Sequence, residues 1–190
     1  YLMSTMDLCT ADHVADYIEA GVTSLKIEGR MKRPEYVAAV TQVYSKTIHH
    51  YYDHTPTYTK QNFDDMKQMF NRHYTKGYPF HDEKIVDERF SGNQGVFLGY
   101  VKGYDYRAKR VSILLKNTLT QGDSIVFEDI DKGRPVNKIY YRNQLINKAE
   151  SGQTVQIEFD DVVKSGVVNK TISVDTIKRM QETYHEEKKY

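Results

Sequence analysis

The residues with the clearest chemical capacity are grouped in one short segment of the N-terminal half. Glu28, Arg30 and Lys32 occupy alternate positions of the run Glu28-Gly29-Arg30-Met31-Lys32-Arg33. An arginine guanidinium binds a carboxylate or a phosphate through its planar fork, and a nearby carboxylate can orient it or transfer a proton. We therefore name Glu28, Arg30 and Lys32 as candidate catalytic residues in a substrate-facing loop. A surface loop with an internal Glu–Arg pair is the alternative that spacing alone leaves open.

The chain has one cysteine, Cys9, which excludes an internal disulfide framework and a complete zinc or iron–sulfur site. A lone cysteine is usually a small buried apolar group, or else one ligand of a cluster whose other ligands lie elsewhere. His13 lies one helical turn away, but no third group that would orient it is evident. His50 and His54 have the i,i+4 spacing of a zinc pair without the Glu of an H-E-x-x-H motif, so we expect a solvent-facing helix end. We expect this chain alone to hold no cofactor.

Basic and aromatic residues alternate in the C-terminal half. Residues 1–90 contain 11 Lys and Arg against 13 Asp and Glu, a net charge of −2, whereas residues 91–190 contain 16 against 13, a net charge of +3. Tyrosines among the basic residues, such as Tyr106 and Tyr140, could stack on nucleobases. A solvated surface with tyrosines used for packing is the alternative. The candidate RNA-binding residues are Lys102, Arg107, Lys109, Arg110, Lys138 and Arg142.

Alternating strands and helices must position the first group of candidates. Asp7 can cap a helix over 11–20, and residues 22–27 are typical of a short strand. Pro34 fits the first turn of a long helix, and a shorter helix is expected around 61–72. This order is the signature of βα units.

Two βα units cannot form a domain by themselves, because a parallel sheet needs several strands with both faces covered. A (β/α)₈ barrel without its earlier units is one solution, and an open α/β sheet is the other. In a barrel, the loops that hold Cys9 and Glu28 would lie at the C-terminal ends of strands, where barrel active sites occur. We expect residues 1–90 to be the terminal βα units of an incomplete TIM-like barrel.

From residue 91 the pattern changes to short β-strands separated by turn residues. Strands of this length and spacing are typical of a small closed antiparallel β-barrel, which we assign to residues 91–175. Residues 176–190 are polar and charged and are expected to form a helical tail. The fold class expected for the whole chain is α+β. The expected strands are Gly95–Tyr104, Arg110–Leu115, Ser124–Glu128, Val136–Arg142 and Thr154–Phe159, with a turn over 131–135.

Composition limits the class of protein further. The 190 residues are 39% hydrophobic and 28% charged, which is enough apolar content for a core and excludes wholesale disorder. No apolar run approaches the roughly 18–20 residues of a membrane span. The net charge of +1 gives no general attraction to nucleic acid. Because the chain starts at Tyr1 without a basic-then-apolar leader, we expect a fragment of a cytoplasmic protein, with secretion left open by the absent upstream sequence.

Four segments resemble the collagenase-like (U-thirty-two) peptidase family in the family's own order. The resemblance covers most of residues 1–100 and is specific there. His73 departs from it, because the family usually has Gly at that position, and we expect a local turn to change. The segments are the "DLC" loop Asp7-Leu8-Cys9, the signature SLKIEGRMKRPEYVA at 24–38, Phe70-Asn71-Arg72 with Thr75-Lys76-Gly77-Tyr78, and Asn93-Gln94-Gly95-Val96 with Leu98-Gly99.

The resemblance implies a longer protein with a TIM-like barrel first and a small β-barrel last. The family includes members named for peptide or collagen degradation, others that hydroxylate quinone precursors, and others that form 5-hydroxyuridine in tRNA with prephenate. We expect the intact protein to hydroxylate tRNA, with peptidase activity as the alternative, and this fragment to be inactive alone.

The resemblance also implies a cofactor and partners. Several family members hold an iron–sulfur cluster on four cysteines, and Cys9 resembles the last of the four, which would place the other three upstream of Tyr1. Arg30 would bind the anionic cosubstrate, and Arg30→Ala would abolish activity. The β-barrel would assist tRNA binding, or act as a protein-interaction module that contacts a paralogous family member. Exposed strand edges lead us to expect a dimer.

Overall fold

The computed structural model describes residues 4–87, 92–128 and 132–185, which form two compact units. Unit 1 comprises the described residues of 1–93 and 176–190, and unit 2 is Gln94–Asp175. The boundary expected between residues 90 and 91 lies outside the described residues. Across the described ranges, no helix has both the length and the apolar character needed to cross a membrane.

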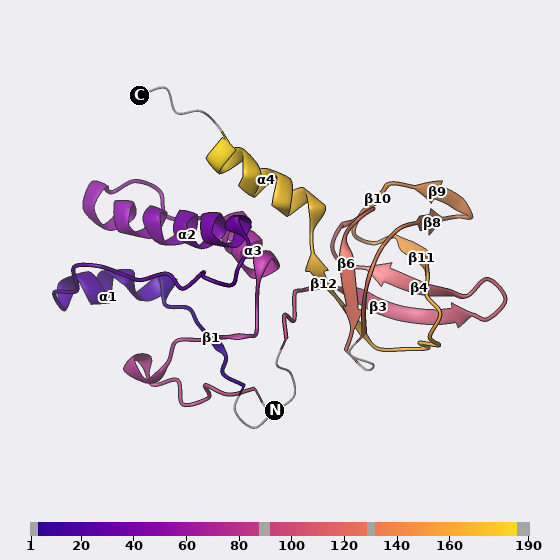
Figure 1. The fold of residues 1–190 in the computed structure, drawn as a ribbon, viewed down its shortest axis with the longest axis horizontal. Helices are drawn as coiled ribbons and strands as arrows, with labels where there is room; N and C mark the ends of the chain where they lie inside the picture. The colour runs from indigo at the N-terminus through magenta and orange to yellow at the C-terminus, as the bar shows by residue number, and fades with distance from the viewer. Residues whose placement is uncertain (1–3, 88–91, 129–131, 186–190) are drawn as a thin grey trace. The chain divides into compact units, whose positions relative to one another are not determined.

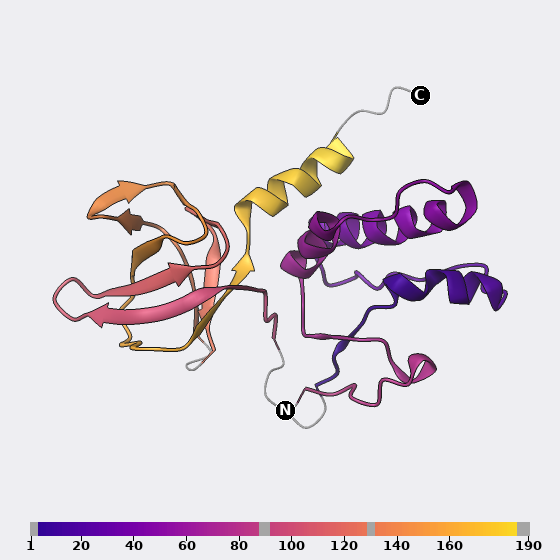
Figure 2. The same cartoon turned by 180° about the vertical axis from the view of Figure 1, so that it is seen from behind.

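Unit 1 is mainly helical, and its helices α2 and α3 lie side by side (Figures 1 and 2). Its core contains Ala39 and Val43 of α2 and Met66 of α3, all almost completely buried. Strands β1 and β2 pair in parallel, with Asp7 opposite Tyr74. The described elements of residues 1–93 are β1 (Asp7–Leu8), η1 (Ala11–His13), α1 (Val14–Glu19), α2 (Pro34–Asp53), α3 (Lys60–Met69), β2 (Tyr74–Thr75) and η2 (Tyr78–Phe80).

The long helix predicted from Pro34 is confirmed, and local sequence explains where it begins and ends. Pro34 occupies the first turn, where its missing N–H costs no helical hydrogen bond. His54 ends the helix in the left-handed conformation, and its N–H donates to the carbonyl of His50. Helix α3 begins with a capping box, in which Thr59 and Asn62 each bind the other's backbone N–H. These signals fix the two helices that form one wall of the site described below.

The polar helix expected at 176–190 corresponds to α4 (Val174–His185), and residues 186–190 lie outside the described part of the chain. Within unit 1, α4 buries Met180 in the same core as α2 and α3. Arg179 Nη2 donates to Asp65 Oδ1 at 2.5 Å, and Gln181 Nε2 donates to Glu35 Oε1 at 2.8 Å. Both acceptors are buried carboxylates, so α4 satisfies groups that would otherwise be costly to bury.

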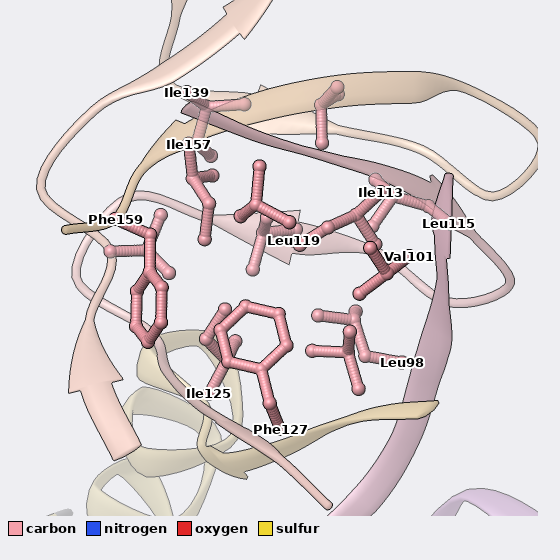
Figure 3. Close-up of a cluster of buried hydrophobic side chains, with 14 of the residues drawn as sticks. Leu98, Val101, Ile113, Leu115, Leu119, Ile125, Phe127, Ile139, Ile157 and Phe159 are labelled. Atoms are coloured by element: carbon pink, nitrogen blue, oxygen red, sulfur yellow. The ribbon is translucent and has the colours of Figure 1, made fainter. Parts of the chain in front are cut away.

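Unit 2 contains a separate antiparallel pair, β5 with β10, and a curled antiparallel sheet of eight strands in the order β7-β6-β12-β3-β4-β11-β8-β9 (Figure 1). Its inward face carries apolar residues at alternate positions, such as Val111, Ile113 and Leu115 of β4. Figure 3 shows this core, in which Phe127 and Phe159 meet with ring centroids 4.6 Å apart. The strands of unit 2 are β3 (Val96–Asp105), β4 (Arg110–Leu115), β5 (Leu119–Thr120), β6 (Ser124–Phe127), β7 (Lys132–Pro135), β8 (Ile139–Tyr141), β9 (Gln144–Ile146), β10 (Lys148–Ala149), β11 (Thr154–Glu158) and β12 (Val167–Ile172).

The antiparallel sheet agrees with the sequence prediction, but its closure and two of its elements do not. Among the described strands, β7 and β9 are the two edges of the sheet and do not pair with each other, so the sheet curls without closing into a barrel. The turn expected over 131–135 is largely strand β7, because its backbone pairs with β6. The strand expected over Val136–Arg142 shortens to Ile139–Tyr141, the stretch that pairs with β11 and β9.

Two expectations for unit 1 are wrong. Residues 22–27 form no strand, and Val22 and Leu25 are exposed. A strand exists only beside a hydrogen-bonding neighbour, and no described strand lies beside this segment. Asp7 caps no helix, because its carboxylate binds Arg72 instead. The parallel pairing that the structure shows is limited to β1 and β2, so units of a TIM-like barrel are not confirmed.

His73 occupies a backbone conformation that favours glycine. Its φ angle is 64°, a region in which a side chain costs roughly 1 kcal/mol. The imidazole Nδ1 lies 2.6 Å from Oδ2 of the buried Asp87, and the His73 carbonyl accepts the N–H of Asp7 at 2.9 Å. The side chain at this strained position therefore makes a compensating polar contact.

Substituting His73 separates these two effects. We expect His73→Ala to lower the free energy of unfolding by about 1–2 kcal/mol, because it loses the contact with Asp87 and keeps the strained backbone. His73→Gly loses the same contact but relieves the strain, so we expect it to be about 1 kcal/mol more stable than His73→Ala. Urea unfolding followed by circular dichroism measures both. Equal stability of the two variants would show that the backbone at residue 73 is not strained.

Candidate functional site

A cavity of about 420 Å³ lies in unit 1 and collects several of the candidate residues. It is lined by residues from β1 and the segment after it, α1, the segment before α2, α2, α3 and the segment around β2. Cys9, Glu28 and Lys32 line this cavity, and Arg30 does not. Its other polar and aromatic walls include Asp7, Arg72, Tyr36, Tyr44, Phe70 and Tyr74.

An ion pair between Asp7 and Arg72 forms one side of the cavity. Arg72 Nε and Nη2 donate to Asp7 Oδ1 at 2.9 and 2.7 Å, and the Arg72 backbone N–H donates to Asp7 Oδ2 at 2.9 Å. Both side chains are half-buried, where such charge-assisted hydrogen bonds are strong. Because β1 and β2 are paired, the contact joins two residues that are 65 positions apart in the sequence. Both carboxylate oxygens of Asp7 therefore accept hydrogen bonds from Arg72.

Lys32 brings a further positive charge to this cavity. Its Nζ lies 2.9 Å from the centroid of the Phe70 ring and 6.0 Å from that of Tyr36. Within the described part of the chain Lys32 forms no ion pair, since Asp7 is held by Arg72. Burial lowers the pKa of the Lys32 ammonium, and the nearby positive charge of Arg72 lowers it further, while Asp7 acts in the opposite direction. An anion beside Lys32 would favour its charged form.

Cys9 is half-buried among tyrosines. Burial raises the pKa of the thiol above its ordinary value, although hydrogen bonds from Ala11 and Tyr44 act against the shift. The Tyr44 hydroxyl also accepts the Thr10 backbone N–H at 3.0 Å. Burial likewise raises the pKa values of Tyr36, Tyr44 and Tyr74, so these phenols remain protonated at neutral pH. The wall around Cys9 is thus aromatic, neutral and rich in hydroxyl donors.

Glu28 and Arg30 lie in the exposed segment before α2. The Glu28 carboxylate accepts the backbone N–H of Arg30 at 2.9 Å, and Lys26 Nζ lies 4.0 Å from its other oxygen. The Arg30 guanidinium forms no ion pair with Glu28 within the described residues, so the internal Glu–Arg pair offered as an alternative does not form. The structure brings Lys32 and Cys9 together at the cavity and leaves the Arg30 side chain exposed.

The described residues bring together no nucleophile and base of the peptidase type. His13 Nδ1 contacts Asp16 Oδ2 at 2.8 Å and its ring stacks on Phe80, but no interaction joins it to Cys9. His50 Nδ1 donates to the carbonyl of Thr55, whereas His54 ends α2 in the left-handed conformation. No group of three or more His, Cys, Asp or Glu residues among those described could hold a metal ion. The side chains of His50 and His54 are exposed, as expected for a solvent-facing helix end.

The six candidate RNA-binding residues of unit 2 fall into two groups. Lys138 is engaged, with Nζ 3.3 Å from Glu158 Oε1, and the Arg110 guanidinium carbon lies 3.4 Å from the centroid of the Tyr140 ring. The other four are exposed and form no ion pair among the described residues. They are Lys102, Arg107, Lys109 and Arg142.

Comparison with known proteins identifies the family. Residues 1–88, which contain the whole cavity, match the sequence profile of peptidase family U32. The chain belongs to peptidase family U32.

The curated U32 relatives carry two kinds of name. The "tRNA hydroxylation protein P1" of Bacillus subtilis is 32% identical over 133 residues, covering 67% of this chain and 32% of the relative. An "uncharacterized protease" of Methanocaldococcus jannaschii is 25% identical over 186 residues, covering 87% of this chain and 43% of the relative. A "collagenase" of Porphyromonas gingivalis is 29% identical over 178 residues, covering 86% of this chain and 48% of the relative. The chain thus spans about a third to a half of the length of these relatives.

Among solved structures, the C-terminal domain of a Geobacillus thermoleovorans protein assigned to the U32 peptidases is similar at a TM-score of 0.36 and 20% identity. The match covers 38% of this chain and 96% of that domain.

Sequence reasoning missed Asp7 and Arg72 as site residues of this U32 chain, although both lie in segments that resemble the family. They are separated by 65 positions, and only the pairing of β1 with β2 brings them into contact. The signal that could have found them is their place in two family motifs, Asp7-Leu8-Cys9 and Phe70-Asn71-Arg72. The tyrosines around Cys9 gave no sequence signal, because tyrosines are frequent in this chain.

Proposed function

We propose that the whole protein hydroxylates uridine in tRNA and that the cavity of unit 1 binds its anionic cosubstrate, which in this family resemblance is prephenate. Curated relatives named for tRNA hydroxylation come from Bacillus subtilis, Haemophilus influenzae and Escherichia coli, and these are 31–32% identical to this chain over two thirds of its length. These names support the proposal at a distant level of identity.

The observation that carries the proposal is the Lys32 ammonium on an aromatic wall, without a carboxylate of its own among the described residues. A ligand that combines a six-membered ring with carboxylates matches this wall, because the ring packs on Tyr36 and Phe70 while a carboxylate pairs with Lys32. Glu28, at the rim, is the carboxylate that could exchange a proton with the ligand. Arg30, exposed in the same segment, would then contact the RNA or the cosubstrate from outside the cavity.

The proposal includes an architecture for the whole protein. The βα elements of unit 1 would complete a TIM-like barrel together with further strands, and the sheet of unit 2 would assist substrate binding. Cys9 would be one ligand of an iron–sulfur cluster, which supplies electron transfer when bound. The fit to this chain is partial, because Cys9 lines the cavity but one cysteine cannot hold a cluster.

Peptidase activity finds less support in the geometry. A cysteine nucleophile must be a thiolate, whereas burial raises the pKa of Cys9 and keeps the thiol protonated at neutral pH. The His–Asp pairs of the described residues, His13–Asp16, His49–Asp53 and His73–Asp87, have no hydroxyl or thiol nucleophile bonded to the ring. Peptidase activity, which the collagenase names of some relatives suggest, is therefore the competing outcome in the test below.

The test is nucleoside analysis of tRNA from cells with and without the gene. We expect loss of the gene to remove a uridine derivative that is heavier by one oxygen atom, and re-expression of the whole protein to restore it. Purified whole protein should leave gelatin intact. Unchanged tRNA nucleosides together with gelatin cleavage would overturn the proposal in favour of a peptidase.

A further inference from the structure

One end of the unit 2 sheet concentrates cations and tyrosine rings, of which Tyr106 is exposed. The β3–β4 hairpin projects from the sheet in both views (Figures 1 and 2). Arg110 at the start of β4 lies opposite Asp105 of β3 and Glu158 of β11, and Lys138 lies beside Glu158. We call this region the hairpin end: residues 104–110 with Arg134, Lys138, Tyr140, and residues 158–164.

The acidic residues of the hairpin end are already bound to partners within it. Asp105 Oδ1 accepts the backbone N–H groups of Arg107 and Ala108, both at 2.9 Å, which orders the tip of the hairpin. Glu158 accepts hydrogen bonds from Tyr140 and Lys138. Asp160 and Asp161 pair with Arg134.

Positive charge is therefore left over at the hairpin end. Arg107, Lys109 and Lys164 are exposed and form no ion pair among the described residues. The whole chain has a net charge of only +1, so this surplus is local. Cations without an acidic partner are what the phosphate groups of a nucleic acid bind.

Aromatic rings lie among these cations. Tyr106 is 62% exposed, its ring meets Tyr104 edge-on at a centroid distance of 5.3 Å, and Lys164 Nζ lies 5.8 Å from the ring centroid. The Arg110 guanidinium is held over Tyr140, and its Nε is buried with no hydrogen-bond partner among the residues that the structure describes. Exposed rings and guanidinium groups between phosphate-binding cations are typical of surfaces on which unpaired bases stack.

We propose that the hairpin end binds single-stranded RNA, with Tyr106 stacked on a base and with Arg107, Lys109 and Lys164 on phosphates. The choice of RNA rests on the proposed function, since the geometry by itself fits any single-stranded nucleic acid. An acidic protein surface would use the cations but gain nothing specific from the exposed Tyr106 ring, so the ring favours a partner with bases.

Two exposed cations outside the hairpin end supply a matched control. Lys116 follows the last residue of β4, away from Arg110 at its start, and Lys76 lies in unit 1 and does not line the cavity. Both side chains are exposed. The pair R107Q/K109Q and the pair K76Q/K116Q change the net charge equally, so only position distinguishes them.

The first experiment measures the affinity of the 190-residue chain for a fluorescent oligouridylate over a series of salt concentrations. R107Q/K109Q should reduce affinity at low salt by roughly tenfold and lower the slope of log affinity against log salt by about 1.4, since each phosphate contact to a single strand contributes about 0.7. K76Q/K116Q should change neither the affinity nor the slope by more than about twofold. Absence of binding at low salt, or equal losses in the two pairs, would overturn the proposal.

The second experiment distinguishes base stacking on Tyr106 from the electrostatic attraction of phosphates. Tyr106→Ala should reduce oligouridylate affinity by roughly five- to a hundredfold, and Tyr106→Phe should restore it, whereas binding of inorganic polyphosphate should not respond to either change. Equal effects on both probes, or tight binding of polyglutamate that displaces the RNA, would overturn the proposal and indicate an acidic protein partner. Because these assays need no hydroxylation, they can succeed where the tRNA nucleoside test fails.

Discussion

Asp123→Asn is expected to lower the free energy of unfolding of unit 2 by about 3 kcal/mol, at the lower end of the range for breaking a buried ion pair. Asp123 is fully buried, and its Oδ2 lies 3.4 Å from Nζ of the buried Lys170. Its two oxygens also accept the backbone N–H groups of Thr120 and Val174. The amide keeps the shape of the side chain but removes the negative charge that lies beside the Lys170 ammonium.

The loss should be moderated, because Asp175 acts electrostatically on Lys170 as well. The Lys170 ammonium also donates to the carbonyl of Thr118 at 2.8 Å, a bond that the substitution leaves in place. The urea midpoint of the β-sheet transition, followed by far-ultraviolet circular dichroism, measures the effect. Asp123→Asn should shift it far more than the matched control described next.

Lys138→Gln is the control, because it breaks an exposed ion pair of the same sheet. Lys138 and Glu158 are each about half exposed, and such pairs contribute roughly 0–1 kcal/mol. The double variant Asp123→Asn with Lys170→Met should lower the free energy of unfolding by less than the sum of the two single changes. Each single change leaves one buried charge without the opposite charge of this pair, whereas the double variant removes both charges. Strict additivity would show that the two charges are not coupled in the folded state.

Lys32→Met in the whole protein should lower kcat/KM for the anionic cosubstrate by roughly 10- to 100-fold. This is the loss expected when a charge-assisted hydrogen bond of about 1.5–3 kcal/mol is removed. Methionine is only one atom shorter than lysine and is apolar, so it fills most of the same space against Phe70 and removes the charge. We expect most of the loss in KM, since Lys32 is held in place before the ligand arrives.

The pH dependence follows from the shifted pKa. Burial lowers the pKa of Lys32, and a bound anion would raise it again, so the affinity for the cosubstrate should fall as the pH rises through the pKa of the free protein. The Lys32→Met enzyme should lack this fall. Lys76 is an exposed cation that does not line the cavity, so Lys76→Gln should leave kcat/KM and KM unchanged.

Two results would contradict this assignment. If Lys32→Met changes kcat/KM by less than about twofold, the cavity cation does not bind the cosubstrate. If Arg30→Ala abolishes activity while Lys32→Met does not, the anion binds at the exposed segment, as the sequence alone predicted. The two variants therefore decide between the site suggested by spacing and the site suggested by the cavity.

Local patterns in the sequence were sufficient for most elements. The helix from Pro34, the helix near residue 61 and strands such as Arg110–Leu115 follow from propensity, caps and alternation, which act over neighbouring residues. The same patterns failed for residues 22–27, because apolar and β-branched residues make a strand only where a neighbouring strand accepts their hydrogen bonds.

The sequence by itself determined the family, the change from helices to strands near residue 90 and the candidate status of Cys9, Glu28 and Lys32, since each depends on residues close together in the chain. The tertiary structure decided which of them share a cavity, that Asp7 binds Arg72 rather than a helix N-terminus, and which cations of unit 2 have no acidic partner. The physical reason is that these contacts join residues up to 65 positions apart. A carboxylate takes the strongest donor that folding brings within reach, and only the fold determines which donor that is.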